Sequence, residues 1–182
     1  MVKCLYIFIY FFLFTNVEAN NRKNIIINLE NTQNLSFKFE QNINEKIERG
    51  NCIIKYPKKI YCEYDGINNK ILVSNGKSLV IKTKDNYFIY PLEKTPLSLI
   101  LDKNFLINKI YNLEEKIIDG SFINYTINEK DNKIDIFFDN KTFYLTSWQT
   151  KDIYQNINIT TLSSMKKNVI IKDNLFRLPA YN

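Results

Sequence analysis

The sequence contains no histidine, and this absence excludes several kinds of catalytic chemistry. Serine or cysteine nucleophiles that rely on an imidazole base, histidine general bases and most catalytic zinc sites all require that side chain. Glycine is also scarce: Gly50, Gly66, Gly76 and Gly120 lie too far apart to form a phosphate-binding loop or a dinucleotide fingerprint. We therefore expect neither a histidine-dependent hydrolase nor a nucleotide enzyme.

The acidic residues offer no better route to catalysis. Glu63 and Asp65 are the one acidic pair beside aromatic residues, whereas a glycosidase needs two carboxylates on facing walls, about 5 to 10 Å apart. Acidic side chains near a strand end are usually solvated, and no spacing of Asp and Glu matches a calcium loop. We expect no enzyme activity, no metal site and no cofactor.

The apolar run at the N-terminus is too short to be a membrane anchor. Residues 4–14 carry no charge, follow Lys3 and precede a stretch that ends at Ala19. A spanning helix needs about 20 apolar residues, whereas this arrangement is typical of a secretory signal peptide. We expect residues 1–19 to be cleaved after Ala19 and residues 20–182 to form one exported domain. No cysteine follows the cleavage site, so no lipid anchor is expected.

The formal net charge of +6 comes from scattered lysines. Because no arginine cluster and no block of stacking aromatic residues accompany them, we do not expect nucleic-acid binding. A mild attraction to anionic lipid headgroups or to an acidic partner fits an exported protein, and simple solubility explains the charge equally well.

Strand patterns dominate the rest of the chain. Leu35, Phe37 and Phe39 alternate with polar residues, which indicates a half-buried strand. Further strands are expected at 47–56, 60–64, 71–74, 77–82, 87–90, 120–128, 133–138, 142–149 and 156–162. Asn75-Gly76 favours a tight hairpin, whereas residues 25–34 fit either a short helix or a poor strand. Short strands with regular turns predict an antiparallel meander or barrel.

Residues 95–102 interrupt the strand pattern with a short apolar helix. Thr95 supplies a capping hydroxyl and Pro96 occupies the first helical position, while Leu97, Ile100 and Leu101 share one face. Such a helix amid strands is either a plug that closes the end of a barrel or a movable lid over a cavity.

Two cysteines remain once Cys4 leaves with the signal peptide. If the hairpin folds symmetrically about Pro57, Cys52 faces Cys62 with Cα atoms about 4.5 to 5.5 Å apart, which a disulfide tolerates. The pair is therefore either a cross-strand disulfide or two buried free thiols.

Several short motifs together resemble the periplasmic outer-membrane lipoprotein carrier family, LolA. The first group is LSFKFEQ at 35–41, GNCIIKYP at 50–57, IYCEY at 60–64 and VSNGK at 73–77. The segment TPLSL at 95–99 resembles the lid of that family, and Trp148-Gln149, Asp152, Thr161-Leu162 and 174–176 resemble its C-terminal strands. The order and spacing of these motifs cover nearly the whole exported chain.

The resemblance implies a mainly β fold with a few helices: an incomplete antiparallel β-barrel with a helical lid over a hydrophobic cavity. It further implies a monomeric periplasmic carrier that takes acylated lipoproteins from an inner-membrane ABC exporter and delivers them to an outer-membrane receptor. The inner-face residues expected around the acyl chains are Phe37, Phe39, Cys52, Ile54, Tyr56, Ile60, Cys62, Tyr64, Leu79 and Ile81. The lid residues are Pro96, Leu97, Ile100 and Leu101.

The chain departs from the family pattern at two places. Tyr56 stands where the family commonly has an arginine associated with holding the lid shut, and a tyrosine hydroxyl could hydrogen bond to the lid backbone instead. Val80 and Lys82 stand where the family often has aromatic residues, which predicts a differently shaped cavity. The alternative function is that of an exported β-rich module that binds protein partners and has a filled core.

Overall fold

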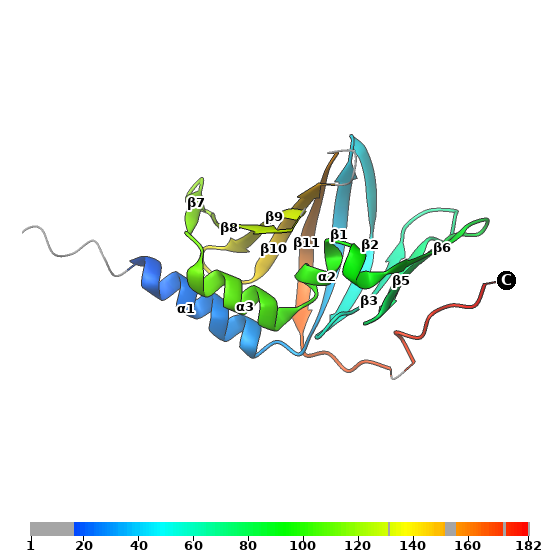
Figure 1. Ribbon diagram of the computed structural model, residues 1–182, viewed down its shortest axis with the longest axis horizontal. Helices are drawn as coiled ribbons and strands as arrows, with labels where there is room; N and C mark the ends of the chain where they lie inside the picture. Colours follow the sequence, from blue (N-terminus) through cyan, green and yellow to red (C-terminus); the bar gives the residue numbers. More distant parts are fainter. Residues whose placement is uncertain (1–16, 131, 152–155, 173, 182) are drawn as a thin grey trace, which may run out of the picture.

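A computed structural model describes residues 17–130, 132–151, 156–172 and 174–181 (Figure 1). Residues 1–16 of the expected signal peptide and Asp152 of the family motif lie outside the described residues. The helical elements are α1 (Val17–Glu30), the 3₁₀ turn η1 (Leu92–Lys94), α2 (Leu97–Ile100) and α3 (Lys103–Asn112). The strands are β1 (Asn34–Ile43), β2 (Lys46–Lys55), β3 (Lys59–Tyr64), β4 (Ile71–Asn75), β5 (Ser78–Lys82), β6 (Tyr87–Pro91), β7 (Lys116–Ile118), β8 (Phe122–Glu129), β9 (Asn132–Asp139), β10 (Leu145–Lys151) and β11 (Ile157–Lys167).

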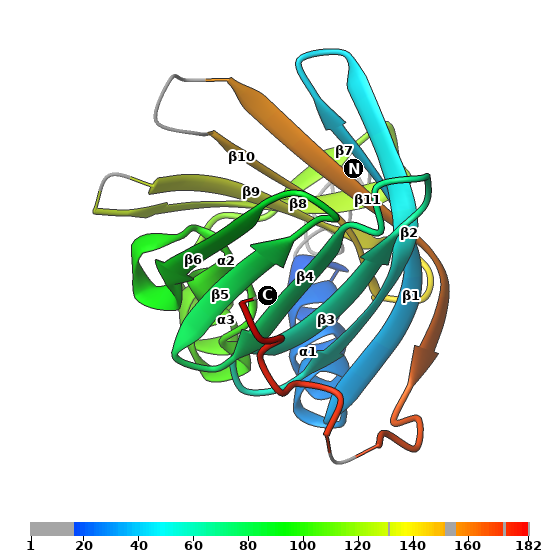
Figure 2. The same ribbon diagram turned by 90° about the vertical axis from the view of Figure 1, so that its right-hand side faces the viewer.

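The described strands form a single antiparallel sheet in the order β6-β5-β4-β3-β2-β1-β11-β10-β9-β8-β7. The last strand, β11, pairs with β1, and this long-range pairing joins the two halves of the sheet. β6 and β7 are the two edges and do not pair with each other, so the sheet curves without closing (Figure 2). The fold is therefore mainly β, an incomplete antiparallel barrel with a few helices, as predicted.

The two longer helices lie side by side under the half of the sheet that contains β7 to β10 (Figure 1). Residues 25–34, which fit either a helix or a strand by sequence, begin with the last turns of α1, where Ile25 and Leu29 are buried. The elements expected from the sequence do not include α3. Its N-cap Asp102 accepts a hydrogen bond from the backbone N–H of Phe105 at 3.1 Å, and its buried residues are Leu106 and Ile110.

Fully buried apolar side chains are concentrated on β8 and β9. Alternate residues of these two strands are fully buried and belong to the same cluster as the apolar faces of α1 and α3. They are Ile123, Tyr125, Ile127, Ile134, Ile136 and Phe138.

The predicted helix at 95–102 is shorter than expected. The structure has η1, then a break, then the single turn of α2. The Thr95 hydroxyl does not cap α2, because it donates instead to the carbonyl oxygen of Leu92 at 2.7 Å, and Pro96 occupies the N-cap position. The prediction of a Thr95 cap is therefore wrong, although the apolar turn is present.

On the face opposite the helices, the C-terminal segment runs across β3, β4 and β5 (Figure 2). Lys82 donates through Nζ to the carbonyl oxygen of Ala180 at 2.9 Å, and Val80 is fully buried. Because Leu79 and Ile81 alternate with these residues, Val80 and Lys82 point away from the helix side of the sheet. Val80 and Lys82, the second departure from the family pattern, therefore do not face the side of the sheet where the cavity was expected.

Candidate functional site

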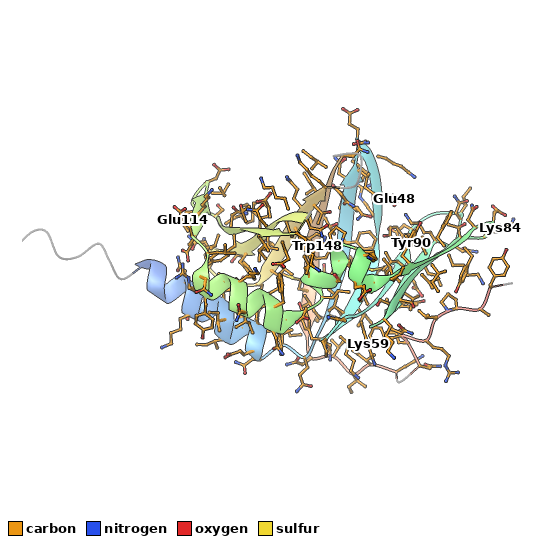
Figure 3. The ribbon with its side chains drawn as sticks, viewed as in Figure 1. Glu48, Lys59, Lys84, Tyr90, Glu114 and Trp148 are labelled. Atoms are coloured by element: carbon orange, nitrogen blue, oxygen red, sulfur yellow. A yellow bond between two sulfur atoms is a disulfide. The ribbon has the colours of Figure 1, made fainter. Side chains whose placement is uncertain are left out.

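A pocket of about 170 Å³ lies between the helix side of the sheet and α2. Its apolar wall comes from neighbouring strands: Phe39, Cys52, Ile60, Cys62, Tyr64, Leu72 and Trp148. Thr95, Pro96, Leu97 and Ile100 form the cover, and Gln41, Thr150, Asn158 and Thr160 form a polar side. Trp148 lies beside α2, where the two halves of the sheet meet (Figure 3).

Strand register explains why these residues share one wall. Cys52 pairs directly with Cys62, and Cys62 pairs with Leu72, so the three side chains point to the same face. The β2–β3 register is the one expected from symmetry about Pro57. A disulfide joins Cys52 to Cys62, with the Cα atoms 4.1 Å apart, so its sulfur atoms are part of the pocket wall.

Aromatic side chains complete the wall. The rings of Phe39 and Tyr64 meet edge to face with centroids 4.9 Å apart, and those of Phe37 and Trp148 meet in the same way at 6.3 Å. Gly50 makes the first contact possible, because a Cβ there would overlap the carbonyl oxygen of Glu63 and lie 2.8 Å from the Phe39 ring.

Half of the predicted cavity residues line this pocket. Phe39, Cys52, Ile60, Cys62 and Tyr64 do, whereas Phe37, Ile54, Tyr56, Leu79 and Ile81 do not. Phe37, Ile54 and Leu79 are buried in the packed core, and Ile81 is half-buried beside Leu72 on the same face. Of the predicted lid residues, Pro96, Leu97 and Ile100 border the pocket, while Leu101 is fully buried beside it.

The lid is tied to the sheet by Lys58 rather than by Tyr56. The backbone N–H of Lys58 donates to the carbonyl oxygen of Leu101 at 2.8 Å, and Lys58 Nζ lies 3.4 Å from Asp102 Oδ2. Tyr56 instead borders a smaller pocket beside Leu29, and burial raises the pKa of its hydroxyl to about 12. The contact with the predicted lid thus comes from Lys58 in the β2–β3 turn, two residues after Tyr56, where it was expected.

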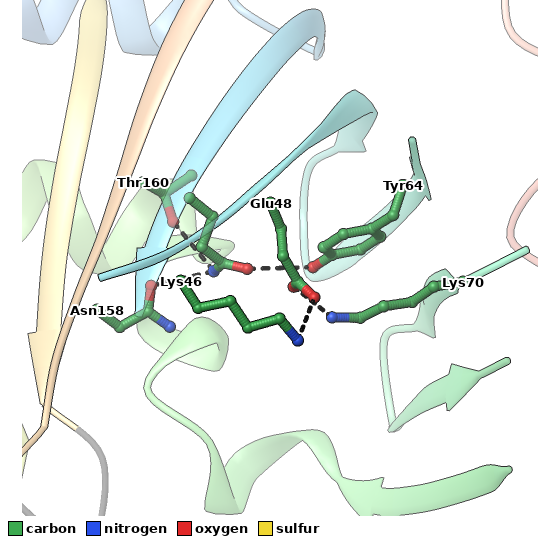
Figure 4. Close-up of polar contacts among 7 residues, drawn as sticks. Lys46, Glu48, Tyr64, Lys70, Asn158 and Thr160 are labelled. Atoms are coloured by element: carbon green, nitrogen blue, oxygen red, sulfur yellow. Dashed lines mark hydrogen bonds and ion pairs between the residues drawn. The ribbon is translucent and has the colours of Figure 1, made fainter. Parts of the chain in front are cut away.

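Charged groups gather beyond the polar side of the pocket (Figure 4). Glu48 lies between Lys70 and Lys46, at 2.5 Å and 3.2 Å from their Nζ atoms. Lys70 Nζ also lies 4.1 Å from the centre of the Tyr64 ring, which places a cation over its face. Burial raises the pKa of Tyr64, and the charge of Glu48 raises it further, so this hydroxyl keeps its proton at neutral pH.

The sequence patterns did not reveal the contributions of β10 and β11 to this pocket. Trp148, Thr150, Asn158 and Thr160 reach it because β11 pairs with β1, more than a hundred residues away along the chain. Only the family resemblance at Trp148 pointed to this region.

Two kinds of feature are missing from the part of the chain that the structure describes. No three acidic, cysteine or histidine side chains come together there as a metal site. None of its helices combines the length and apolar character that crossing a membrane requires.

An incomplete antiparallel barrel with an apolar pocket under a short helical lid is an architecture suited to enclosing apolar ligands. The family model described as outer membrane lipoprotein carrier protein LolA matches residues 30–179. The match spans most of the chain, and this protein therefore belongs to the LolA family. No curated protein matches the chain.

Several solved structures align with this chain at very low identity. A conserved uncharacterized protein from Thermus thermophilus is 7% identical, with a TM-score of 0.52, and the alignment covers 89% of this chain and 94% of that one. A LolA superfamily protein from Nitrosomonas europaea is also 7% identical, with a TM-score of 0.46 and coverage of 86% and 97%. An outer membrane lipoprotein-sorting protein domain from Vibrio parahaemolyticus is 10% identical, with a TM-score of 0.41 and coverage of 88% and 95%.

Proposed function

We propose that this protein is a periplasmic carrier that holds the acyl chains of lipoproteins in the pocket under α2. The observation that carries the proposal is the apolar wall of that pocket, which lies beneath a cover made of Pro96, Leu97 and Ile100. An apolar chain of about 15 carbons resists transfer into water by roughly 12 kcal/mol, at about 0.8 kcal/mol for each methylene. A dry protein interior removes that barrier without any catalytic group.

Uptake of cargo requires α2 to move away from the sheet. The pocket of about 170 Å³ is smaller than the approximately 300 to 1,000 Å³ typical of ligand pockets. Beyond it, Ile81 and Phe88 continue the same face, and Phe88 is 47% exposed. An outward movement of α2 would join this apolar surface to the pocket, and the predicted residues that do not border the closed pocket would then help to line the wider cavity.

The proposed route follows from membership of the family. Residues 1–19 act as the signal peptide, and the monomeric carrier receives lipoproteins from an inner-membrane ABC exporter and passes them to an outer-membrane receptor. The energy for loading comes from the exporter, because this chain needs only to bind and release.

The first test is binding of a fluorescent fatty-acid analogue to the exported chain and to Leu97→Glu. A charge at this position enters the apolar cover, so we expect saturable binding to weaken at least about tenfold. Ile67→Glu is the matched control, because Ile67 is 93% exposed and the same change there leaves binding intact.

Two results contradict the proposal. Equal binding by Leu97→Glu and Ile67→Glu removes the role of the cover. An absence of saturable binding by the unaltered protein favours the alternative, a β-rich module that binds protein partners through its surface.

A further inference from the structure

Uncharged polar side chains form a continuous row across the helix side of the sheet at one end of the pocket. This polar belt consists of Tyr64 on β3, Gln41 on β1, Thr160 and Asn158 on β11, and Thr150 on β10. Figure 4 shows Tyr64, Thr160 and Asn158. Gln41 pairs directly with Thr160, and Thr150 pairs directly with Asn158, so the row follows from strand register. Gln41 lies on one side of the β1–β11 junction, and Thr150, Asn158 and Thr160 lie on the other side.

Hydrogen bonds within the polar belt run in one direction. The Tyr64 hydroxyl donates to Gln41 Oε1 at 3.4 Å. Gln41 Nε2 then donates to Asn158 Oδ1 at 3.1 Å and to Thr160 Oγ1 at 3.3 Å. Each amide oxygen therefore accepts one hydrogen bond within the belt.

The pattern leaves two hydrogen-bond donors for a ligand. Asn158 takes part through its oxygen, so its NH₂ group is not used in the bond to Gln41, and Thr160 accepts that second bond with its hydroxyl proton still available to donate. Asn158 and Thr160 both border the pocket. These two donors beside an apolar pocket match a ligand with an apolar chain that ends in a hydrogen-bond acceptor.

The position of the polar belt selects an uncharged group. Phe39 lies on the apolar side, two residues before Gln41 on β1, which is about 7 Å along the strand. On the other side, Lys46 and Lys70 share the single carboxylate of Glu48. A carboxylate or phosphate at the level of the polar belt would exchange its hydration for contacts with uncharged side chains of the belt, which costs more free energy than the same exchange by a neutral carbonyl group.

We propose that the polar belt binds the carbonyl oxygens of the ester and amide linkages that attach acyl chains to the cargo. These linkages stay beside Asn158 and Thr160, while the acyl chains enter the pocket. This inference rests on the proposed function, since it assumes that acyl chains occupy the pocket. It adds a preference for neutral, ester-linked or amide-linked chains over free fatty acids.

The experiment compares three probes on the same protein: an N-palmitoyl dipeptide amide, palmitate, and the pure hydrocarbon dye diphenylhexatriene. Thr160→Val removes the hydroxyl and keeps the shape of a buried side chain, while Asn158→Leu removes the amide. Thr161→Val is the matched control, because Thr161 is exposed and points to the opposite face of β11.

We expect Thr160→Val and Asn158→Leu each to weaken binding of the N-palmitoyl dipeptide amide about three- to tenfold and to leave diphenylhexatriene binding unchanged. Unchanged dye binding also shows that each variant is folded with its pocket intact. Thr161→Val should match the unaltered protein with all probes, and palmitate should bind the unaltered protein more weakly than the dipeptide amide.

Three results overturn the inference while leaving the proposed function standing: equal loss of dye and dipeptide amide, no loss of the dipeptide amide, or tighter binding of palmitate. Failure of the unaltered protein to bind the dye contradicts the proposed function itself.

Discussion

At the scale of single residues, the carboxylate of Glu48 bonds to two lysines. Burial acts to raise its pKa, but the hydrogen bonds and charges of Lys70 and Lys46 outweigh burial and lower the pKa overall. A lowered pKa in the folded state means that the ionised carboxylate stabilises the fold, and that this contribution is lost as the carboxylate becomes protonated in acid.

The pH dependence of stability follows with a definite sign. Glu48→Gln should be less stable than the unaltered protein at neutral pH, by on the order of 1 kcal/mol, because the ion pairs are only partly shielded from water. The difference should shrink as pH falls below 4.5, the ordinary pKa of the side chain, and vanish once Glu48 is protonated in the folded protein too.

Urea unfolding at a series of pH values measures this difference. Glu45→Gln, in the exposed turn between β1 and β2, is the control for loss of a surface carboxylate. A stability difference that stays constant from neutral to acid pH would show that Glu48 acts through packing rather than through its charge.

At the scale of elements, Asp102 at the junction of α2 and α3 makes two separate contacts. Asp102 caps α3 by accepting from the N–H of Phe105 at 3.1 Å, and it also lies 3.4 Å from Lys58 Nζ in the turn between β2 and β3. Asparagine keeps the capping oxygen but loses the charge, whereas alanine loses both. The two substitutions therefore separate fastening of the lid from stability of the helix.

We expect Asp102→Asn to speed entry of a fluorescent acyl probe by up to about fivefold, since a partly exposed ion pair is worth at most about 1 kcal/mol. Its unfolding temperature should change little, while Asp102→Ala should in addition lose about 1 kcal/mol of stability with the cap. Stopped-flow fluorescence and thermal unfolding measure the two effects. Entry at an unchanged rate in Asp102→Asn would leave only the backbone bond from Lys58 to Leu101 as the fastening of the lid.

At the scale of the whole molecule, the two halves of the sheet differ in how they are filled. Packed side chains occupy the interior between β8, β9 and the two longer helices, whereas the half under α2 contains the pocket. Local opening needs little free energy where few apolar contacts are broken, so the half with the pocket should open first.

Native-state amide exchange tests this asymmetry. We expect the slowest exchange at residues 123–127 and 134–138 and exchange at least about tenfold faster at the backbone N–H of Leu101, which bonds to Leu97 in the lid. A long-chain acyl ligand should slow exchange in the lid and leave β8 and β9 nearly unchanged. Uniform protection across both regions would indicate that the lid does not open separately.

Local patterns in the sequence predict the structure correctly where it depends only on segments that are neighbours along the chain. Alternation at 35–39 marks β1, and symmetry about Pro57 places Cys52 opposite Cys62, because a hairpin register depends only on its own turn. The helix α3 is missing from the expected elements even though Asp102 can cap it and Leu106 and Ile110 follow at helical spacing. The polar side of the pocket was not predicted because Gln41 and Thr160 are brought together by a pairing of strands from opposite ends of the chain.

The bond between Cys52 and Cys62 has a practical consequence for making the protein. Because both sulfur atoms belong to the pocket wall, a chain produced in a reducing cytosol would present two thiols to whatever enters. Alkylating reagents and thiol-reactive dyes would then modify the interior itself. Recombinant material exported to an oxidising compartment is the form in which ligand affinities should be measured.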